Sequence, residues 1–328
     1  YGRRLPLMLD IVFYSVIEVL SGLAPNYTTF IILRLLYGVG MGGEWGVGAS
    51  LTMESVPPRW RGICSGLLQQ GYAVGYMVAA GVSYFVYPHW GWRPMFFIGG
   101  LPALLSLFIR AKVKESPAWQ RSRTDWRSYR RSILRNWKLF LYIIVMMMLM
   151  SSMAHGTQDM YPTFLKHQRG LSEETTSVIV VISMFGAILG GIAFGLLSDS
   201  KGRRVSMVIA ALAAALLIPL WMFAPSTGMI VAGAFLMQFM VQGAWGVVPA
   251  HLNELAPDAI RGFFPAFAYQ LGVLCASSTT YLQARFAQHF TYSAVMGSSM
   301  AVVLVVGAVV IAVGPERRGV VFGEISGQ

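Results

Sequence analysis

Long apolar runs, set apart by glycine, proline and charged residues, limit what this chain can fold into. A membrane-spanning helix needs roughly 20 largely apolar residues, and the 328 residues divide into ten such runs. They cover 5–23, 28–50, 62–87, 94–110, 139–165, 175–197, 205–223, 228–250, 262–287 and 294–313. Lipid cannot bond backbone polar groups, so spans are helices or closed barrels, and these runs lack the alternation of barrel strands. The sequence therefore predicts an all-α membrane protein.

The composition excludes several other classes of protein. Hydrophobic residues make up 55% of the chain and charged residues only 12%, whereas about a quarter of the residues in a soluble domain are charged. Cys64 and Cys275 lie in different apolar runs, which excludes a disulfide framework, a CxxC redox pair and a metal finger. The sequence shows no metal-ligand cluster and no set of nucleophile, base and orienting residue. It therefore indicates neither an enzyme nor a cofactor.

The 25 lysines and arginines are unevenly distributed between the segments that connect the spans. Twenty lie in alternate connecting segments, four lie in the others, and Arg34 lies inside a span. Basic residues favour the cytoplasmic side, so we expect the linker 111–138 and the tail 315–328 to be cytoplasmic in a multi-pass protein of the inner (plasma) membrane. The net charge of +11 then reflects topology, and no nucleic-acid partner is predicted.

The second half of the chain repeats the first at a constant offset of 200 residues. Within 45–62, seven of eighteen positions are identical at that offset. The pairs are Trp45/Trp245, Gly46/Gly246, Val47/Val247, Glu54/Glu254, Pro57/Pro257, Arg61/Arg261 and Gly62/Gly262. Chance identity is about one in eighteen per position, so the sequence predicts two duplicated bundles in parallel orientation.

The repeat divides the chain into regions. We expect an N-terminal bundle of four spans in 1–110, the basic linker 111–138, a C-terminal bundle of six spans in 139–314, and the tail 315–328. Two spans precede the Gly-Arg-Arg loop of the second half, and none precedes that of the first. The expectation is therefore a fragment with about ten of twelve spans, in which the first two are missing.

Two loop motifs occur in both halves. The first is GLLSDSKGRR, with Asp199, Gly202, Arg203 and Arg204, whose end recurs as Gly2, Arg3 and Arg4. The second is ExxPxxxRG, with Glu54 and Arg61 in one copy and Glu254 and Arg261 in the other. They resemble the loop signatures of the major facilitator superfamily and of its sugar-porter-like branch, which implies a fold of two six-helix bundles. We expect these charges to pair across cytoplasmic helix ends in one conformation and to separate in the other, as a gate.

A narrower resemblance rests on two tracts, RLLYGVGMGGEWGVGASLTMESVPPRWRG and HGTQDMYPT. The first resembles the sialate:proton symporter family, and the second resembles the seventh-helix motif of that family's lactate and pyruvate permeases. The residues that fit this motif are His155, Thr157, Gln158, Asp159 and Thr163, whereas Ser151 and Ala154 replace its usual asparagine and hydroxyl residue. The resemblance implies proton-coupled symport of a monocarboxylate.

His155 and Asp159 are candidates to carry the proton. They are four residues apart, so they lie on one face of a helix, with Gln158 beside them. An ionisable side chain at bilayer depth costs about 2.5–3.5 kcal/mol on insertion scales and usually faces a cavity or a partner. The alternative is that His155 bonds Asp159 only to fix helix packing.

Arg34 is the candidate for binding the substrate carboxylate. It lies six residues inside its span, at a depth of about 9 Å, and a guanidinium binds carboxylates bidentately. An arginine here is also typical of the carboxylate carriers in the family. We expect Arg34, His155 and Asp159 to border one cavity. The alternatives are that Arg34 extends outward, or that it pairs with Glu18 or Glu44.

Three further polar residues are assigned within spans. Glu44 is a second candidate proton site, or part of a packing network around Trp45. Gln70 and Gln270 are repeat mates that we expect on opposite walls of the cavity, and Gln270 resembles a specificity position of the lactate permeases; helix packing is the alternative for both. Gly38, Gly42 and Gly46 form a small-residue stripe, which predicts a close helix contact.

The sequence therefore predicts a secondary active transporter that carries a small monocarboxylate, such as lactate or pyruvate, together with a proton. Its two halves would alternate in opening the site to each side of the membrane. The alternative within the superfamily is a sialic acid or aromatic-acid symporter, and a more distant one is a membrane sensor that does not transport. The expected partners are the carboxylate, protons and lipid, for a monomeric protein.

Overall fold

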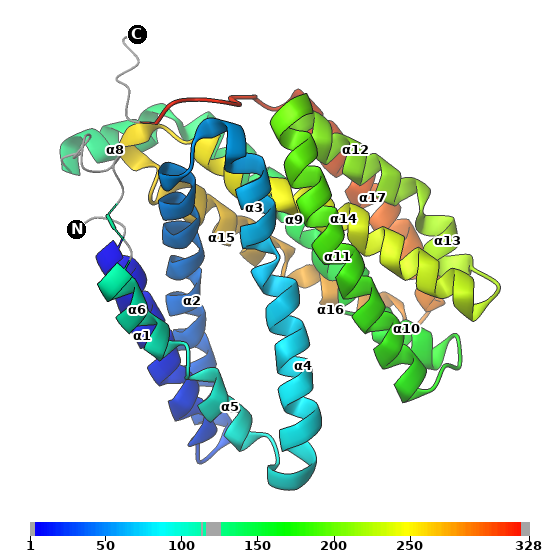
Figure 1. Cartoon of the computed structure of the whole chain (residues 1–328). Helices are drawn as coiled ribbons and strands as arrows, with labels where there is room; N and C mark the ends of the chain where they lie inside the picture. Colours follow the sequence, from blue (N-terminus) through cyan, green and yellow to red (C-terminus); the bar gives the residue numbers. More distant parts are fainter. Residues whose placement is uncertain (1–3, 113, 116–125, 323–328) are drawn as a thin grey trace.

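The computed structural model describes residues 4–112, 114–115 and 126–322, and within these ranges it consists of helices and their connections (Figure 1). The first half contains α1 (Arg4–Gly22), α2 (Tyr27–Ser55), α3 (Arg61–Gln69), α4 (Gly71–Trp90), α5 (Arg93–Gly99) and α6 (Ala103–Lys112). After α8 (Trp126–Arg135), the second half contains α9 (Trp137–Gln158), α10 (Tyr161–His167), α11 (Glu173–Lys201), α12 (Arg203–Leu216), α13 (Ile218–Phe223), α14 (Thr227–Leu255), α15 (Phe264–Ala276), α16 (Ser278–Phe286) and α17 (Tyr292–Val313). Gly2, Arg3 and part of the linker 111–138 lie outside the described residues.

Each predicted span coincides with one helix or with two consecutive helices. Among the described residues, six stretches are long and apolar enough to cross a membrane. They are Arg4–Gly22, Trp137–His167, Glu173–Lys201, Arg203–Phe223, Thr227–Leu255 and Tyr292–Val313. Other predicted spans are interrupted, as at Gln70 between α3 and α4 and at Ser277 between α15 and α16. The count of ten spans out of twelve stays a prediction.

Short polar side chains and one glycine set the ends of the long helices. Asn26, Ser172, Ser226 and Thr291 each accept a hydrogen bond from the backbone N–H three residues later, which caps α2, α11, α14 and α17. Gly202 ends α11 with φ 101°, a conformation that glycine adopts without a steric penalty. The chain can therefore turn directly from α11 into α12, and this explains the glycine in the Gly-Arg-Arg loop.

Apolar side chains cover both the interior and the outside of the helices. The main core lies in the second half, where methionines such as Met146, Met150 and Met300 are fully buried. Large apolar residues are also widely exposed, among them Leu216 at 83% and Val313 at 78%. A helix that is apolar all round fits a lipid environment, so the exposed residues form the expected lipid-facing surface.

Small residues allow the two halves to approach closely. α3 packs against α11 and α14, and α2 packs against α15. A Cβ added to Gly66 would meet the backbone carbonyl of Gly191, and one added to Gly46 would meet Ala266. The predicted close contact along the glycine stripe is confirmed for Gly46 and for Gly42, which lies against Gln270, whereas Gly38 faces open space.

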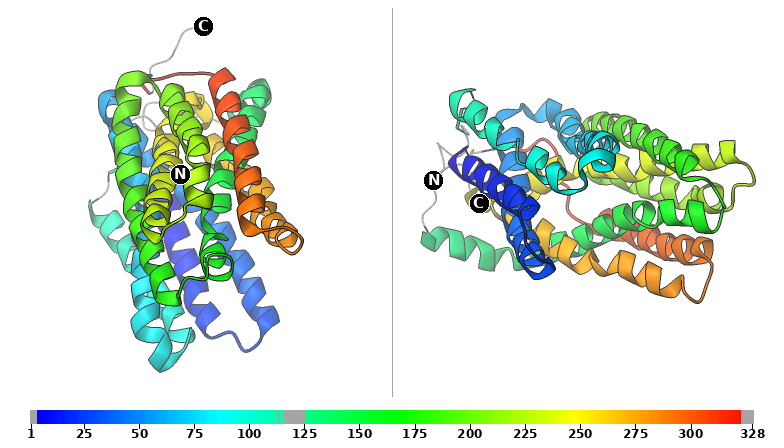
Figure 2. Two further views of the ribbon diagram at one scale, coloured as in Figure 1. Left: turned by 90° about the vertical axis from the view of Figure 1, so that its right-hand side faces the viewer. Right: turned by 90° about the horizontal axis from the view of Figure 1, so that it is seen from below.

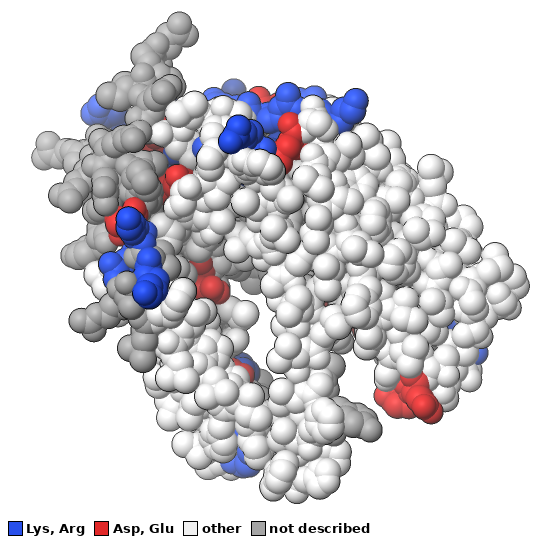
Figure 3. All heavy atoms as spheres, in the orientation of Figure 1, with Lys and Arg blue, Asp and Glu red and all other residues white. Residues whose placement is uncertain are grey.

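The two ends of the molecule differ in charge and in closure. Lysine and arginine gather mainly at the end where α8 lies (Figures 1 and 3), hereafter the basic end. The connections from α2 to α3, from α11 to α12 and from α14 to α15 lie at this end too (Figure 1). Away from this end, the surface is hollowed between α4 and the group formed by α1, α2 and α5 (Figure 3). Seen from below, α1 and α2 lie at one side and the helices of the second half fill the other (Figure 2). The halves therefore meet at the basic end and diverge from it.

Candidate functional site

The seventh-helix motif lies at a helix break. α9 ends at Gln158, and α10 begins at Tyr161 with Pro162 in its first turn, where proline is tolerated because that N–H needs no helical partner. The His155 ring nitrogen Nδ1 lies 3.2 Å from Asp159 Oδ2, and the Thr280 hydroxyl donates to the same oxygen at 2.6 Å. The two side chains, which the sequence places on one helix face, are therefore in contact. Thr280, from α16, is a partner that the sequence analysis missed.

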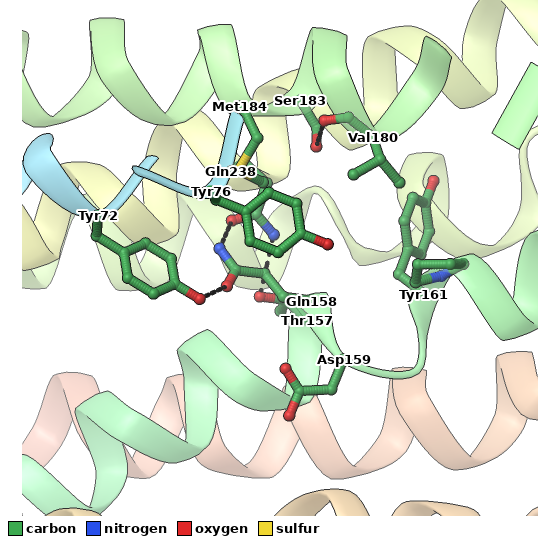
Figure 4. Close-up of a pocket in the computed structure, with 11 residues that line it drawn as sticks. Tyr72, Tyr76, Thr157, Gln158, Asp159, Tyr161, Val180, Ser183, Met184 and Gln238 are labelled. Atoms are coloured by element: carbon green, nitrogen blue, oxygen red, sulfur yellow. Dashed lines mark hydrogen bonds between the residues drawn. The ribbon is translucent and has the colours of Figure 1, made fainter. Parts of the chain in front are cut away.

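Gln158 is held by a chain of hydrogen bonds. Its Nε2 donates to Gln238 Oε1 at 2.8 Å, and Gln238 Nε2 donates to Thr157 Oγ1 at 3.2 Å. Thr157 in turn donates to the Met153 carbonyl at 2.8 Å. From the first half, the Tyr72 hydroxyl approaches Gln158 Oε1 at 3.4 Å (Figure 4). A polar contact between the two halves therefore forms next to the His155 and Asp159 pair.

Two cavities adjoin at Tyr72. The first has a volume of about 100 Å³ and lies between α4, α11, α14 and the α9–α10 break (Figure 4). Its lining includes Tyr72, Tyr76, Gln158, Asp159, Tyr161 and Gln238. The second has a volume of about 650 Å³ and lies between α2, the α3–α4 junction and α15. Its lining includes Glu44, Trp45, Tyr72, Tyr269 and Gln270. Both cavities lie between the halves and share Tyr72 in their linings; together they are called the chamber below.

Aromatic rings close the second cavity between the halves. Trp45 from α2 stacks on Tyr269 from α15, with ring centroids 4.2 Å apart. Trp245, the repeat mate of Trp45, packs edge-on against the same tyrosine at 5.9 Å. The duplicated tryptophans thus hold one ring between them, and Glu44 lies in the cavity that this contact borders.

Arg34 does not line either of these cavities. Its Nη2 lies 2.8 Å from Glu18 Oε2, and it also donates to the Ser21 hydroxyl. The guanidinium lies 4.6 Å from the ring centroid of Tyr37 and 5.0 Å from that of Phe96. The expectation that Arg34 shares a cavity with Asp159 is therefore not met. The pairing with Glu18, an alternative that the sequence left open, is the arrangement observed, because three helices of the first half enclose the guanidinium.

The repeat mates Gln70 and Gln270 are not equivalent. Gln270 lines the second cavity and donates to the Gly42 carbonyl at 3.2 Å. Gln70 is 6% exposed and lies against Gly191 of α11, outside the lining of either cavity. Both glutamines contact the opposite half of the molecule. The structure therefore places Gln270 at the chamber and Gln70 in helix packing.

The charged loop residues form a network at the basic end. Asp199 accepts hydrogen bonds from the backbone N–H groups of Gly62 at 2.8 Å and Ile63 at 3.0 Å, and it pairs with Arg203 at 2.7 Å. Arg203 is fully buried and also bonds Glu254, at 2.9 and 3.0 Å. Asp199 thus caps the start of α3 from the other half. Asp199 pairs with Arg203 as expected, whereas Glu254, which was expected to pair with Arg261, bonds Arg203 here.

The segment after α17 joins the same network. The ring of Phe322 lies between two repeat mates, with its centroid 3.5 Å from the Arg61 guanidinium carbon and 3.8 Å from that of Arg261. Burial lowers the pKa of Arg61 to about 10, so its guanidinium stays charged at neutral pH. Glu316 accepts from the backbone N–H groups of Arg203 and Arg204. The sequence analysis did not assign the tail to this network.

The other loop residues have simpler surroundings. Arg4, the repeat mate of Arg204, donates its backbone N–H to Glu115 Oε2 at 3.3 Å. Glu54 lies in the last turn of α2.

Within residues 4–112, 114–115 and 126–322, no three histidine, cysteine or acidic side chains gather closely enough to hold a metal.

Comparison with known proteins places this geometry in a family. The fold is similar to that of the proton:xylose symporter XylE of the major facilitator superfamily, with a TM-score of 0.77, 20% identity, and coverage of 98% of this chain and 82% of that one. A probable 4-methylmuconolactone transporter of Cupriavidus pinatubonensis is 30% identical over 99% of this chain and 78% of its own length. The sialic acid transporter NanX of Escherichia coli is 29% identical over 83% of this chain and 68% of its own length.

A further relative is longer than this chain. The carboxylic acid transporter protein homolog of Saccharomyces cerevisiae is 28% identical over 88% of the chain, which spans about half (51%) of that protein. The profile of the sugar (and other) transporter family matches residues 1–140 and 138–316. This match covers both duplicated halves. The chain has the fold of the major facilitator superfamily and belongs to the sugar (and other) transporter family of membrane transporters.

Proposed function

We propose that the protein carries a small carboxylate together with a proton, by alternating access of its two halves. The observation that carries the proposal is the pair of His155 and Asp159. It lies at the break between α9 and α10, where Asp159 lines the cavity between the halves. An acid and an imidazole at bilayer depth, next to a cavity, are suited to take up and release a proton.

The proton would control whether the substrate binds. A carboxylate that enters the cavity approaches Asp159, and two negative charges a few ångströms apart repel each other strongly in a medium of low dielectric constant. A proton held by the pair of His155 and Asp159 removes this repulsion. Loading of the anion would therefore require the proton, and the two would cross together. Glu44, in the adjoining cavity, is proposed as a second proton site.

The substrate class is supported by both the motif and the relatives. The seventh-helix motif favours lactate or pyruvate, and the names of the relatives include a carboxylic acid transporter and a sialic acid transporter. A sialic acid or an aromatic acid is thus the alternative substrate. Gln158 and Gln270 are proposed to contact the substrate, since each lines one part of the chamber.

The network at the basic end is proposed as the gate that alternates. In this structure it joins the halves, and the hollow opens away from it. Rocking of the halves would separate Asp199 from the start of α3 and open the chamber at the basic end, which we propose is cytoplasmic.

Uptake in proteoliposomes tests the proposal. The full-length protein should accumulate labelled lactate when the outside is acidic, and a protonophore should abolish accumulation. Asp159→Asn should reduce proton-driven accumulation at least about tenfold but retain exchange of substrate between the two sides, because the neutral side chain no longer alternates in charge. Glu173→Gln, which removes a carboxylate paired with Lys166 inside one half, is the control. Normal accumulation by Asp159→Asn would remove the proposed coupling.

A further inference from the structure

The cavity beside Asp159 offers neutral donors to an anion. Tyr72 and Tyr76 lie one turn apart on α4, and both are about half exposed, at 51% and 49%. Tyr161 faces the same space from the start of α10 (Figure 4). None of the described residues that line this cavity is lysine or arginine. A carboxylate that enters therefore meets hydroxyl and amide groups, and the guanidinium of Arg34 is already paired with Glu18 elsewhere.

The amide of Gln158 is oriented before any substrate arrives. One N–H is committed to Gln238, and Gln238 is committed to Thr157. The amide nitrogen has a second N–H, which is a donor for a ligand. On the other side, the contact from Tyr72 to Gln158 Oε1 is 3.4 Å long, whereas an O–H to O hydrogen bond is normally about 2.7–2.8 Å. The Tyr72 hydroxyl can therefore exchange this weak partner for a carboxylate oxygen.

Aromatic rings form two walls of the cavity. The Tyr161 ring is 4% exposed and stacks on Trp221, with centroids 5.3 Å apart and planes inclined by 23°, so its position is fixed by packing. Tyr76 extends into the space from the opposite helix (Figure 4). Aromatic faces pack favourably on other π systems, beyond the gain from burial alone.

We propose that Tyr72 and Gln158 bind the carboxylate of the substrate, and that the rings of Tyr76 and Tyr161 contact a flat, unsaturated skeleton. This inference rests on the proposed function, keeps its carboxylate and proton, and replaces lactate as the preferred substrate by planar unsaturated acids. Tyr72 belongs to the first half and Gln158 to the second, so the bound carboxylate bridges the halves. Neutral donors also suit a symporter, because a permanent cation would retain the anion after the proton has left.

Binding of a matched pair of acids tests the inference. Benzoate and cyclohexanecarboxylate have the same number of carbon atoms and the same carboxylate, but only benzoate is flat and unsaturated. Labelled benzoate should bind to the purified full-length protein, and cyclohexanecarboxylate should compete with it. The inhibition constant of cyclohexanecarboxylate should be at least about tenfold higher than the Kd of benzoate. Tyr72→Phe should weaken benzoate binding about tenfold, or ~1.4 kcal/mol. Tyr76→Leu should remove the preference for benzoate.

The control is Tyr142→Phe, which removes a hydroxyl that reaches only the Met146 sulfur, at 3.5 Å, among the side chains described. Its Kd should equal that of the wild type. Unchanged benzoate binding in Tyr72→Phe, or equal affinity for the two acids, would overturn the inference. If such a protein still accumulates lactate with protons, the proposed function stands. If the wild-type protein binds neither benzoate, cyclohexanecarboxylate nor lactate, both the inference and the proposed function are refuted. The thermal transition of each ligand-free variant confirms that it folds.

Discussion

Asp199 holds the two halves together at the basic end, and its neutralisation should loosen them. The carboxylate caps Gly62 and Ile63 across the interface and pairs with Arg203. Hydrogen bonds to a charged group contribute about 1.5–3 kcal/mol each, and asparagine retains one neutral acceptor. Asp199→Asn should therefore cost the closed arrangement about 2–3 kcal/mol relative to the open one. Since 1.4 kcal/mol corresponds to a factor of ten, the ratio of open to closed protein should rise roughly 30- to 140-fold.

Maleimide labelling of Cys64 can measure this shift. Cys64 lies on α3, is partly exposed and packs against the cluster that contains Met53 and Phe322, so the closed basic end restricts access to it. Its labelling rate should rise at least about tenfold in Asp199→Asn. Cys275 is exposed inside the predicted span 262–287, so it is replaced by serine to leave Cys64 as the thiol that is measured.

The matched control is again Glu173→Gln, since Glu173 pairs with Lys166 within one half, away from the cluster that packs on Cys64, and its loss should leave the Cys64 rate unchanged. An unchanged Cys64 rate in Asp199→Asn, or an equal rise in both variants, would refute the argument that this carboxylate joins the halves.

Two further predictions concern stability. Gly66→Ala should lower the thermal transition temperature by a few degrees, because the added Cβ meets the Gly191 carbonyl. Gly75→Ala should keep or raise that temperature, because nothing lies within 4 Å of the added Cβ. Calorimetry in detergent measures both variants, and equal shifts would contradict the close approach of the halves. Arg34→Gln should destabilise the first half by about 2 kcal/mol, because Glu18 is left partly buried and unpaired. Adding Glu18→Gln should restore most of that loss in the same measurement, and failure of this rescue would argue that Arg34 does more than pair with Glu18.

The pairing of His155 with Asp159 was predictable because it is local. Residues four apart on a helix face the same way whatever surrounds the helix. The partners from other helices were not predictable, since Thr280 lies 121 residues from Asp159 and Tyr72 lies 86 residues from Gln158 in the chain. Tyr72 and Tyr76 could have been noticed by their spacing, two and six residues after Gln70, but tyrosine is also common in helix packing. The sequence also left the partner of Arg34 open, because a guanidinium pairs equally well with the Glu18 carboxylate and with the carboxylate of a substrate.

By itself the sequence determined that the chain forms apolar helices in two duplicated halves, with charged loops at one end. These properties follow from the local rule that a backbone in lipid must bond internally, and from side chains that repeat at a constant offset. Only the tertiary structure decided which polar residues share a chamber. Gln70 and Gln270 are identical by repeat, yet one is buried against Gly191 and the other lines the cavity. The difference arises because each glutamine packs against helices of the opposite half. A residue pattern within one helix cannot predict how helices that are distant in the sequence pack against it.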